Sequence, residues 1–287
     1  MTSPVPTFTW NSAVPPYPEY EYFREKLPFG YKSAPYCIDA SILAYADPDF
    51  AWPVFTKAGF KRVAYLDRQG TQCYVVEKDG ILLVAFRGTQ SNVTKNGKHR
   101  LEVLMDSWTD IDFIMVERKG AYVHEGFASA HAKVWPDLLA LIQNRLVIFT
   151  GHSLGGALAT YSAFKHRFSS CVVSLHTFGA PCVGNKDFVQ AMDERLQSVH
   201  FRYTHNRDGV PSLPPKNFGF EHCGTHIHFG EDPPHNPVKF KRGCLGSIFP
   251  VTIGTIPGWI YDHIPLLYAW HIWERYNGDG SAQGATG

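Results

Sequence analysis

The segment Gly151-His152-Ser153-Leu154-Gly155 constrains the fold more than any other stretch of this 287-residue chain. The apolar run 146–150 enters the segment and predicts a short strand, and the small residues of 155–159 predict a helix that leaves it. A serine with this spacing between strand and helix lies in a sharp, strained turn, and the flanking glycines let the strand and the helix approach closely. The sequence therefore predicts a serine hydroxyl presented at the carboxyl end of a sheet.

The other hydrophobic patterns predict strands that alternate with helices. Strands are expected over 63–66, 72–77, 81–86, 146–150, 172–178 and 200–204, and helices over 34–46, 126–144, 155–168, 186–196 and 271–276. Asp79-Gly80 predicts a tight hairpin turn between the second and third strands. This alternation indicates an α/β fold, with a mostly parallel central sheet and helices on both faces.

The length and the composition predict one large domain with flanking extensions. Residues 1–30 are rich in proline and tyrosine and are expected to form an N-terminal arm that lies on the domain. Residues 31–276 are long enough for a single α/β domain. Residues 277–287 contain glycine, serine and alanine and predict a disordered tail.

Charge and hydropathy exclude some classes of partner. The formal net charge of +1 predicts no general attraction to nucleic acid. The longest apolar stretch, 245–261, is interrupted by glycines and prolines, so no transmembrane segment is expected. The first basic residue is Arg24 and prolines precede it, which does not fit a signal peptide. The sequence is therefore that of a cytoplasmic protein or of a mature secreted form, and it leaves the location and the oligomeric state open.

The cysteines do not form the pattern of a disulfide scaffold. There are six of them, scattered along the chain: Cys37, Cys73, Cys171, Cys182, Cys223 and Cys244. Cys223 with Cys244 is the pairing to test first. The segment 221–228 places histidines beside Cys223, but no second cluster of matching spacing follows, and we expect no metal site.

A serine nucleophile needs a base, and the base needs a carboxylate that orients it. Asp208 follows the predicted strand 200–204, where a sheet delivers catalytic side chains, whereas Asp187 and Asp193 lie on a predicted helix. The chain order serine, acid, histidine leaves several candidates for the base, and composition does not choose among them. They are His222, His226, His228, His235, His263 and His271. The backbone N–H of Leu154, at the start of the predicted helix, is placed to stabilise an oxyanion.

The chain resembles a known family, the class 3 lipases, which include the triacylglycerol lipases of filamentous fungi. The resemblance covers roughly residues 30–276. It is carried by the serine segment with its following helix and by four further segments in the same order. These are Phe86-Arg87-Gly88-Thr89, Val123-His124-Glu125-Gly126-Phe127, the stretch 177–185 and the stretch 206–215. Two positions depart from the family pattern, because Cys182 replaces the usual arginine and His226 replaces an acidic residue.

The resemblance implies roles for residues that the local pattern leaves open. It implies that Ser153, Asp208 and His263 form a catalytic triad in an α/β-hydrolase fold. His263 is implied because the stretch 262–268 is similar to the family's aspartate–histidine segment with a tyrosine downstream, and His235 and His271 are the alternatives for the base. It also implies that Thr89 is an oxyanion residue supported by Asp110. His124 and His152 flank the site and are not expected to act as bases.

The segment 91–107 is longer than the short lid of typical relatives, and it predicts an enlarged lid over the active site. Its apolar residues recur at helical spacing and form one stripe: Leu101, Leu104, Met105 and Trp108. The alternative is an ordinary helix packed on the core. An apolar lid beside Thr89 would also favour adsorption to a lipid interface.

The sequence as a whole predicts a serine carboxylic-ester hydrolase that needs no cofactor. The resemblance implies a triacylglycerol lipase that cleaves acylglycerol esters through an acyl-enzyme. Lipid or small ester substrates are expected, and a phospholipase A1 or a feruloyl-type esterase on the same scaffold is the alternative. A catalytically dead binding protein is disfavoured, because all three triad positions are filled.

Overall fold

The computed structural model of the chain describes residues 20–24, 29–30, 33–89, 112–166, 169–230 and 262–278. Within these residues the largest sheet has seven strands in the order β1-β2-β3-β6-β7-β8-β9. The strands are β1 (Lys61–Arg68), β2 (Thr71–Lys78), β3 (Ile81–Phe86), β6 (Val147–His152), β7 (Val172–Phe178), β8 (His200–His205) and β9 (Thr225–Phe229). The first three pair antiparallel, and β3, β6, β7, β8 and β9 pair parallel. The prediction of a mostly parallel sheet is therefore confirmed.

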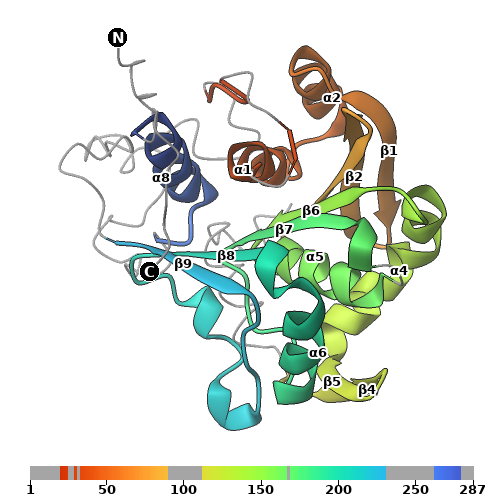
Figure 1. Ribbon diagram of the computed structural model, residues 1–287, viewed down its shortest axis with the longest axis vertical. Coiled ribbons are helices and arrows are strands. Elements are labelled where there is room, and N and C mark those ends of the chain that lie inside the picture. Colours follow the sequence, from red (N-terminus) through yellow and green to blue (C-terminus); the bar gives the residue numbers. More distant parts are fainter. Residues whose placement is uncertain are drawn as a thin grey trace, which may run out of the picture.

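Helices cover both faces of this sheet (Figure 1). One face carries α1 (Ala34–Leu43), α2 (Pro48–Lys57) and α8 (Pro265–Gly278), and the other carries α4 (Glu125–Ile142), α5 (Leu154–Lys165) and α6 (Lys186–Leu196). A short hairpin, β4 (Met115–Arg118) with β5 (Ala121–His124), forms a separate two-stranded sheet. No helix in the described ranges is long and apolar enough to cross a membrane.

The two faces of the sheet contribute to two hydrophobic cores. Phe149 and Leu175 pack into the core under α4, α5 and α6, whereas Ile148 and Phe178 pack into the core under α1 and α8. All six residues of β6 are buried, because the strand lies in the middle of the sheet with helices on both sides. This explains why the central strands read as continuous apolar runs rather than as alternating patterns.

Tight turns connect the antiparallel strands. Asp79-Gly80 joins β2 to β3 with φ values of 52° and 78°, as the sequence predicts for a hairpin, and Gln69-Gly70 and Lys119-Gly120 repeat the pattern. Two consecutive positive φ values match the right-handed twist of the flanking strands, and glycine adopts them at little cost.

The parallel strands all end at the same edge of the sheet. In the register of this sheet Phe86 of β3 lies beside Gly151 of β6, His152 lies beside Phe178 of β7, and Phe178 lies beside Tyr203 of β8. The loops that follow these four strands therefore meet in one place. Three of them carry Thr89, Ser153 and Asp208, so the fold brings these predicted site residues to one edge.

Candidate active site

Ser153 occupies the turn between β6 and α5 in a strained conformation. Its φ of 58° and ψ of −131° lie in a region that residues with a side chain rarely adopt. The backbone holds this conformation because Ser153 N–H donates to Phe178 O at 2.9 Å, and Ser153 O accepts from Gly156 N–H at 2.9 Å. The turn is the nucleophile elbow that the sequence predicts.

The two glycines of the elbow lie where backbones touch. A Cβ at Gly151 would lie 2.2 Å from the carbonyl carbon of Gly155, and a Cβ at Gly155 would lie 2.3 Å from Phe86 O. Real Cβ atoms do not approach backbone this closely. The glycines therefore let α5 pack directly on β6 and on the end of β3, which fixes where Ser153 stands.

Asp208 and His263 form a buried pair. His263 Nδ1 lies 2.8 Å from Asp208 Oδ2, and the side chains of the two residues are 3% and 0% exposed. The other carboxylate oxygen, Asp208 Oδ1, accepts from Val210 N–H at 2.9 Å, which fixes the rotation of the carboxylate. Because a carboxylate only accepts hydrogen bonds, Nδ1 carries the proton in the neutral imidazole and Nε2 has a free lone pair. His263 is therefore in the tautomer that a general base requires.

The Ser153 hydroxyl and the outer nitrogen of His263 are both buried. Among the described residues, neither Ser153 Oγ nor His263 Nε2 has a hydrogen-bond partner, and both atoms are inaccessible to solvent. In enzymes without substrate, the hydrogen bond between a catalytic serine hydroxyl and its histidine is often long, and it tightens when substrate binds.

Tyr268 is a further part of the site, and the sequence did not identify its role. Its hydroxyl donates to Asp208 Oδ2 at 2.5 Å, the same oxygen that His263 contacts. Burial and the negative charge of Asp208 raise the pKa of Tyr268 well above its ordinary value, so the hydroxyl keeps its proton. The signal available in the sequence was the tyrosine downstream of His263 in the stretch 262–268, which resembles a segment of the family.

His152 supports the base from the side of the elbow. Its Nε2 lies 2.8 Å from His263 O and its Nδ1 lies 2.9 Å from Tyr45 Oη. Since a carbonyl oxygen only accepts, Nε2 donates and Nδ1 accepts from the tyrosine hydroxyl. Burial, together with the nearby His263, lowers the pKa of His152 well below 6.5. His152 therefore stays neutral with both nitrogens engaged.

The structure places both predicted oxyanion residues at this edge. Leu154 is the first residue of α5, and Thr89 lies three residues beyond the end of β3, the strand beside β6. The neighbouring Gly88 packs against the elbow, because a Cβ there would lie 2.9 Å from His152 O and even closer to the hydroxyl of Tyr45. A side chain at position 88 would therefore collide with the backbone before Ser153 and with Tyr45.

Several predictions lie outside the described residues. One is the lid over 91–107, with its stripe of Leu101, Leu104, Met105 and Trp108. The others are Asp110 as oxyanion support, His235 as the alternative base, and the pairing of Cys223 with Cys244. No disulfide joins two of the described cysteines.

The reserve residues for the triad have other partners. Asp187 accepts from Asn185 Nδ2 at 2.8 Å, and Asp193 accepts from Gly224 N–H at 2.8 Å. His271 stacks on the ring of Phe229 with centroids 4.9 Å apart. Among the candidates that the structure describes, the pair that it brings together is the one implied by the resemblance.

The histidines near Cys223 also have structural partners. His226 Nε2 and His228 Nδ1 lie 2.8 Å and 2.9 Å from Thr204 Oγ1, so the two rings share one face of β9. His124 Nδ1 accepts from Gly126 N–H at 3.1 Å and caps α4. In the described part of the chain, no group of three or more metal-binding side chains gathers.

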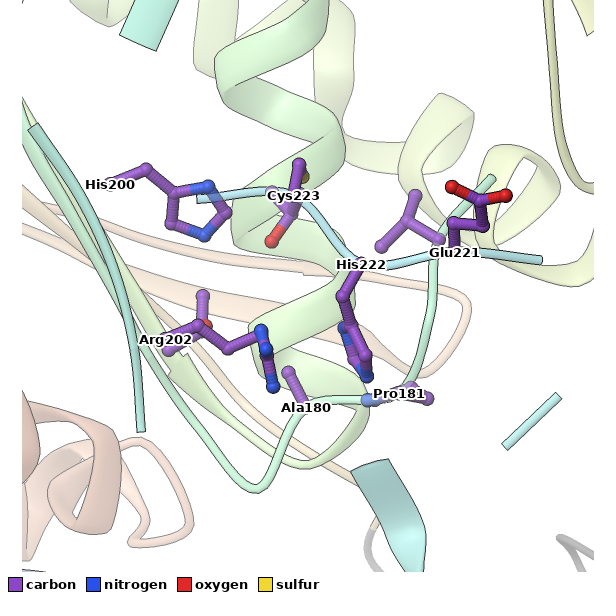
Figure 2. A pocket seen from close by; sticks show the side chains of 10 residues that line it. Ala180, Pro181, His200, Arg202, Glu221, His222 and Cys223 are labelled. Atoms are coloured by element: carbon purple, nitrogen blue, oxygen red, sulfur yellow. The ribbon is translucent and has the colours of Figure 1, made fainter. Parts of the chain in front are cut away.

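A small polar cavity lies behind the loop that carries Asp208. Figure 2 shows His200, Arg202 and His222 around it, and its volume is about 10 Å³, which is room for one water-sized molecule and not for a substrate. Burial and the charge of Arg202 lower the pKa of His200 to about 3 and that of His222 to about 4. Neutral His222 donates through Nε2 to Pro211 O at 2.6 Å. The cavity wall therefore supports the loop of Asp208.

A seven-stranded, mostly parallel sheet with a serine in a nucleophile elbow and an Asp–His pair at the same edge defines an α/β-hydrolase. The family model described as Lipase (class 3) matches residues 83–218. The chain belongs to the class 3 lipase family.

Individual relatives agree with this assignment. A lipase of Rhizopus niveus is 35% identical over 216 residues, which are 68% of this chain and 50% of the relative. A secreted mono- and diacylglycerol lipase of Fusarium solani is 36% identical over 110 residues, covering 36% of this chain and 33% of the relative. The solved structure of lipase II from Rhizopus niveus aligns with a TM-score of 0.59 and 26% identity, over 81% of this chain and 92% of that one. The chain spans about half the length of the Rhizopus niveus lipase sequence that it matches.

Proposed function

We propose that this chain is a serine carboxylic-ester hydrolase that cleaves acylglycerol esters through an acyl-enzyme. The observation that carries the proposal is the buried pair of Asp208 and His263, 2.8 Å apart, beside a serine in a nucleophile elbow. The relatives named lipases, one of them a mono- and diacylglycerol lipase, support acylglycerols as the substrate class.

In the first half-reaction, Ser153 Oγ attacks the ester carbonyl while His263 Nε2 takes the hydroxyl proton. The imidazole becomes positively charged, and Asp208 stabilises that charge through its contact with Nδ1. The carbonyl oxygen becomes an oxyanion, which the N–H groups of Thr89 and Leu154 would bind. Collapse of the tetrahedral intermediate breaks the ester C–O bond, and His263 returns its proton to the leaving alcohol.

In the second half-reaction, water replaces the alcohol. His263 Nε2 takes a proton from water, the hydroxide attacks the acyl carbon, and the bond to Ser153 Oγ breaks as the serine regains a proton. The products are a carboxylic acid and an alcohol, and the cycle consumes no cofactor.

The decisive test is substitution of the nucleophile and of the base. Ser153→Ala and His263→Ala should each lower kcat on p-nitrophenyl butyrate by more than about 1,000-fold, because members of a triad act as a unit. A fluorophosphonate probe should label wild type on Ser153 and leave the Ser153→Ala variant unlabelled. Labelling is read by peptide mass spectrometry, and folding is read by circular dichroism.

His271→Ala is the matched control, because His271 also lies in the segment 262–278 and contacts Phe229 rather than Asp208. It should keep kcat within about 3-fold of wild type. If Ser153→Ala turns over substrate normally, or if His271→Ala is the inactivating change, the proposed site is wrong. A substrate panel of triolein, monoolein, phosphatidylcholine and methyl ferulate then separates a lipase from a phospholipase and from a feruloyl esterase.

A further inference from the structure

Asp262, the residue before His263, joins two segments of the site. It is buried, and its carboxylate accepts from Asn206 Nδ2 at 3.2 Å through Oδ1 and from Arg207 N–H at 3.1 Å through Oδ2. Its backbone carbonyl lies 3.0 Å from His205 Nδ1. One residue therefore contacts three consecutive residues at the end of β8, across more than 50 positions of sequence.

These contacts lie next to the acid and next to the base. Arg207 immediately precedes Asp208, and Asp262 immediately precedes His263. The turn before the acid is tight, because Asn206 has a φ of 41°, in the left-handed region that asparagine adopts more readily than most residues. Asp208 N–H donates to His205 O at 2.9 Å and closes this turn. The position of the acid therefore depends on a turn that Asp262 holds.

The base is held by the same residue. His263 comes from the segment 262–278, and Asp208 comes from the loop after β8, so no covalent constraint sets the distance between their side chains. The carboxylate of Asp262 fixes the separation of the two backbones one residue upstream of each side chain. A small displacement of either backbone would lengthen the 2.8 Å contact between Nδ1 and Oδ2.

We propose that Asp262 is a positioning residue that keeps Asp208 and His263 within hydrogen-bond distance. This proposal rests on the triad assigned above. The contacts of Asp262 described above are with the turn 205–207, and it makes no hydrogen bond to Ser153 Oγ or His263 Nε2. Its effect passes through the turn 205–207 and through the backbone of His263, so it acts on the rate of the chemical steps rather than on substrate binding.

The first variant is Asp262→Asn. The amide keeps the shape of the carboxylate but offers an oxygen to only one of the two donors, and its NH2 group then faces the other donor. We expect kcat on p-nitrophenyl butyrate to fall by about 10- to 100-fold, with KM within about 2-fold of wild type, because a misplaced catalytic pair slows chemistry.

The rescue variant exchanges the two groups. Asn206→Asp combined with Asp262→Asn places a carboxylate opposite an amide again, and aspartate tolerates the left-handed conformation of residue 206 nearly as well as asparagine. The decrease in log kcat relative to wild type should be at most half as large in the double variant as in Asp262→Asn. Asn206→Asp alone places two carboxylates next to each other and should lower kcat.

Asp39→Asn is the matched control for loss of a buried carboxylate. Asp39 Oδ2 accepts from Phe23 N–H at 2.6 Å, and its contacts lie in the core under α1 rather than at the triad. This variant should keep kcat within about 2-fold. Asn206→Gly is the second test of the contact, because glycine accepts a positive φ without strain. It should lower kcat several-fold with little change in Tm.

The proposal is overturned if Asp262→Asn and Asn206→Gly both keep kcat within 2-fold of wild type. It is also overturned if the double variant shows no recovery, or if Asp39→Asn loses as much kcat as Asp262→Asn does. These outcomes are distinct from failure of the proposed function, because Ser153→Ala would remain inactive and unlabelled in all of them.

Discussion

At the scale of single residues, Gly179 lies where a side chain would collide with the proposed acid and base. It follows β7 and has a φ of 57°. A Cβ there would lie 2.8 Å from Asp208 Oδ2 and 3.0 Å from His263 Nδ1. The position therefore requires glycine for two reasons, its backbone conformation and the space that the Asp–His pair occupies.

Gly179→Ala should separate these two reasons when compared with Gly120→Ala. Gly120 has a φ of 79°, and a Cβ there would meet no atom within 4 Å, so it carries the same backbone penalty away from the site. Backbone strain should cost each variant about 1–2 kcal/mol of unfolding free energy in urea titrations, and Gly179→Ala should lose more because its methyl group also meets Asp208 and His263. Gly179→Ala alone should also lower kcat by about 10-fold or more, because the new methyl group pushes His263 away from Asp208. Equal kcat values for the two variants would contradict this interpretation.

The contrast between predicted and missed residues has a physical explanation. Ser153 was predicted because its local context is diagnostic, and Asp208 and His263 were predicted because segments around them match a family. Asp262 and Tyr268 received no role, because their contacts join the segment 262–278 to the loop after β8. Only a folded structure shows pairings between segments so distant in sequence.

At the scale of elements, the close packing of α5 on β3 and β6 depends on Gly155. Gly155→Ala would place a methyl group 2.3 Å from Phe86 O, and this backbone atom cannot rotate away. We expect a loss of about 3 kcal/mol of unfolding free energy and reduced kcat, because α5 must shift and carry the elbow with it.

The control is Gly126→Ala in the first turn of α4. There the nearest atom is a ring carbon of His124 at 3.1 Å, and a side chain can move by the small distance required. Alanine also favours the helix by about 1 kcal/mol, so this variant should remain within about 1 kcal/mol of wild type in urea. If Gly155→Ala is equally harmless, direct contact between helix and strand does not limit this position.

Most elements could be predicted from periodicity, and the missed ones show where that signal fails. The run 172–178 and the helix 186–196 were predicted with the observed bounds, β7 and α6. The helix α2 was missed because prolines stand at its first position and inside it, at Pro48 and Pro53. The strand β9 was missed because its side chains are mostly exposed and polar, as an edge strand allows.

At the scale of the whole molecule, Asp39 joins the segment 20–24 to the two helices α1 and α8. It is fully buried and accepts from Tyr20 Oη at 2.6 Å and from Trp273 Nε1 at 3.1 Å. Burial raises the pKa of Asp39 to about 6, although the hydrogen bonds and the nearby Arg24 oppose that rise. The carboxyl group therefore favours the folded state most when it is protonated.

This pKa predicts how the stability of the protein depends on pH. The pKa of Asp39 is raised on folding from its ordinary 3.8 to about 6, so its contribution is full below pH 3.8 and is lost as the pH rises through 6. The difference in unfolding free energy between wild type and Asp39→Asn should thus fall by about 2 kcal/mol between pH 4 and pH 8. Urea titrations of both proteins across this range measure the difference, and buried histidines such as His200 titrate in both and cancel. A constant difference would contradict the prediction.

The position of His263 along the chain has a consequence for biosynthesis. All seven strands of the main sheet are complete at Phe229, and the proposed nucleophile and acid precede that point, but the proposed base is translated 110 residues after Ser153. At ordinary rates of translation this delay is about 5 to 20 seconds. On the proposed mechanism, a nascent chain would carry its serine without a partner that can activate it, and ester cleavage would begin only after the segment 262–278 had docked against α1. Hydrolysis of a fluorogenic ester during cell-free translation would therefore time the docking of the segment 262–278 rather than the formation of the sheet.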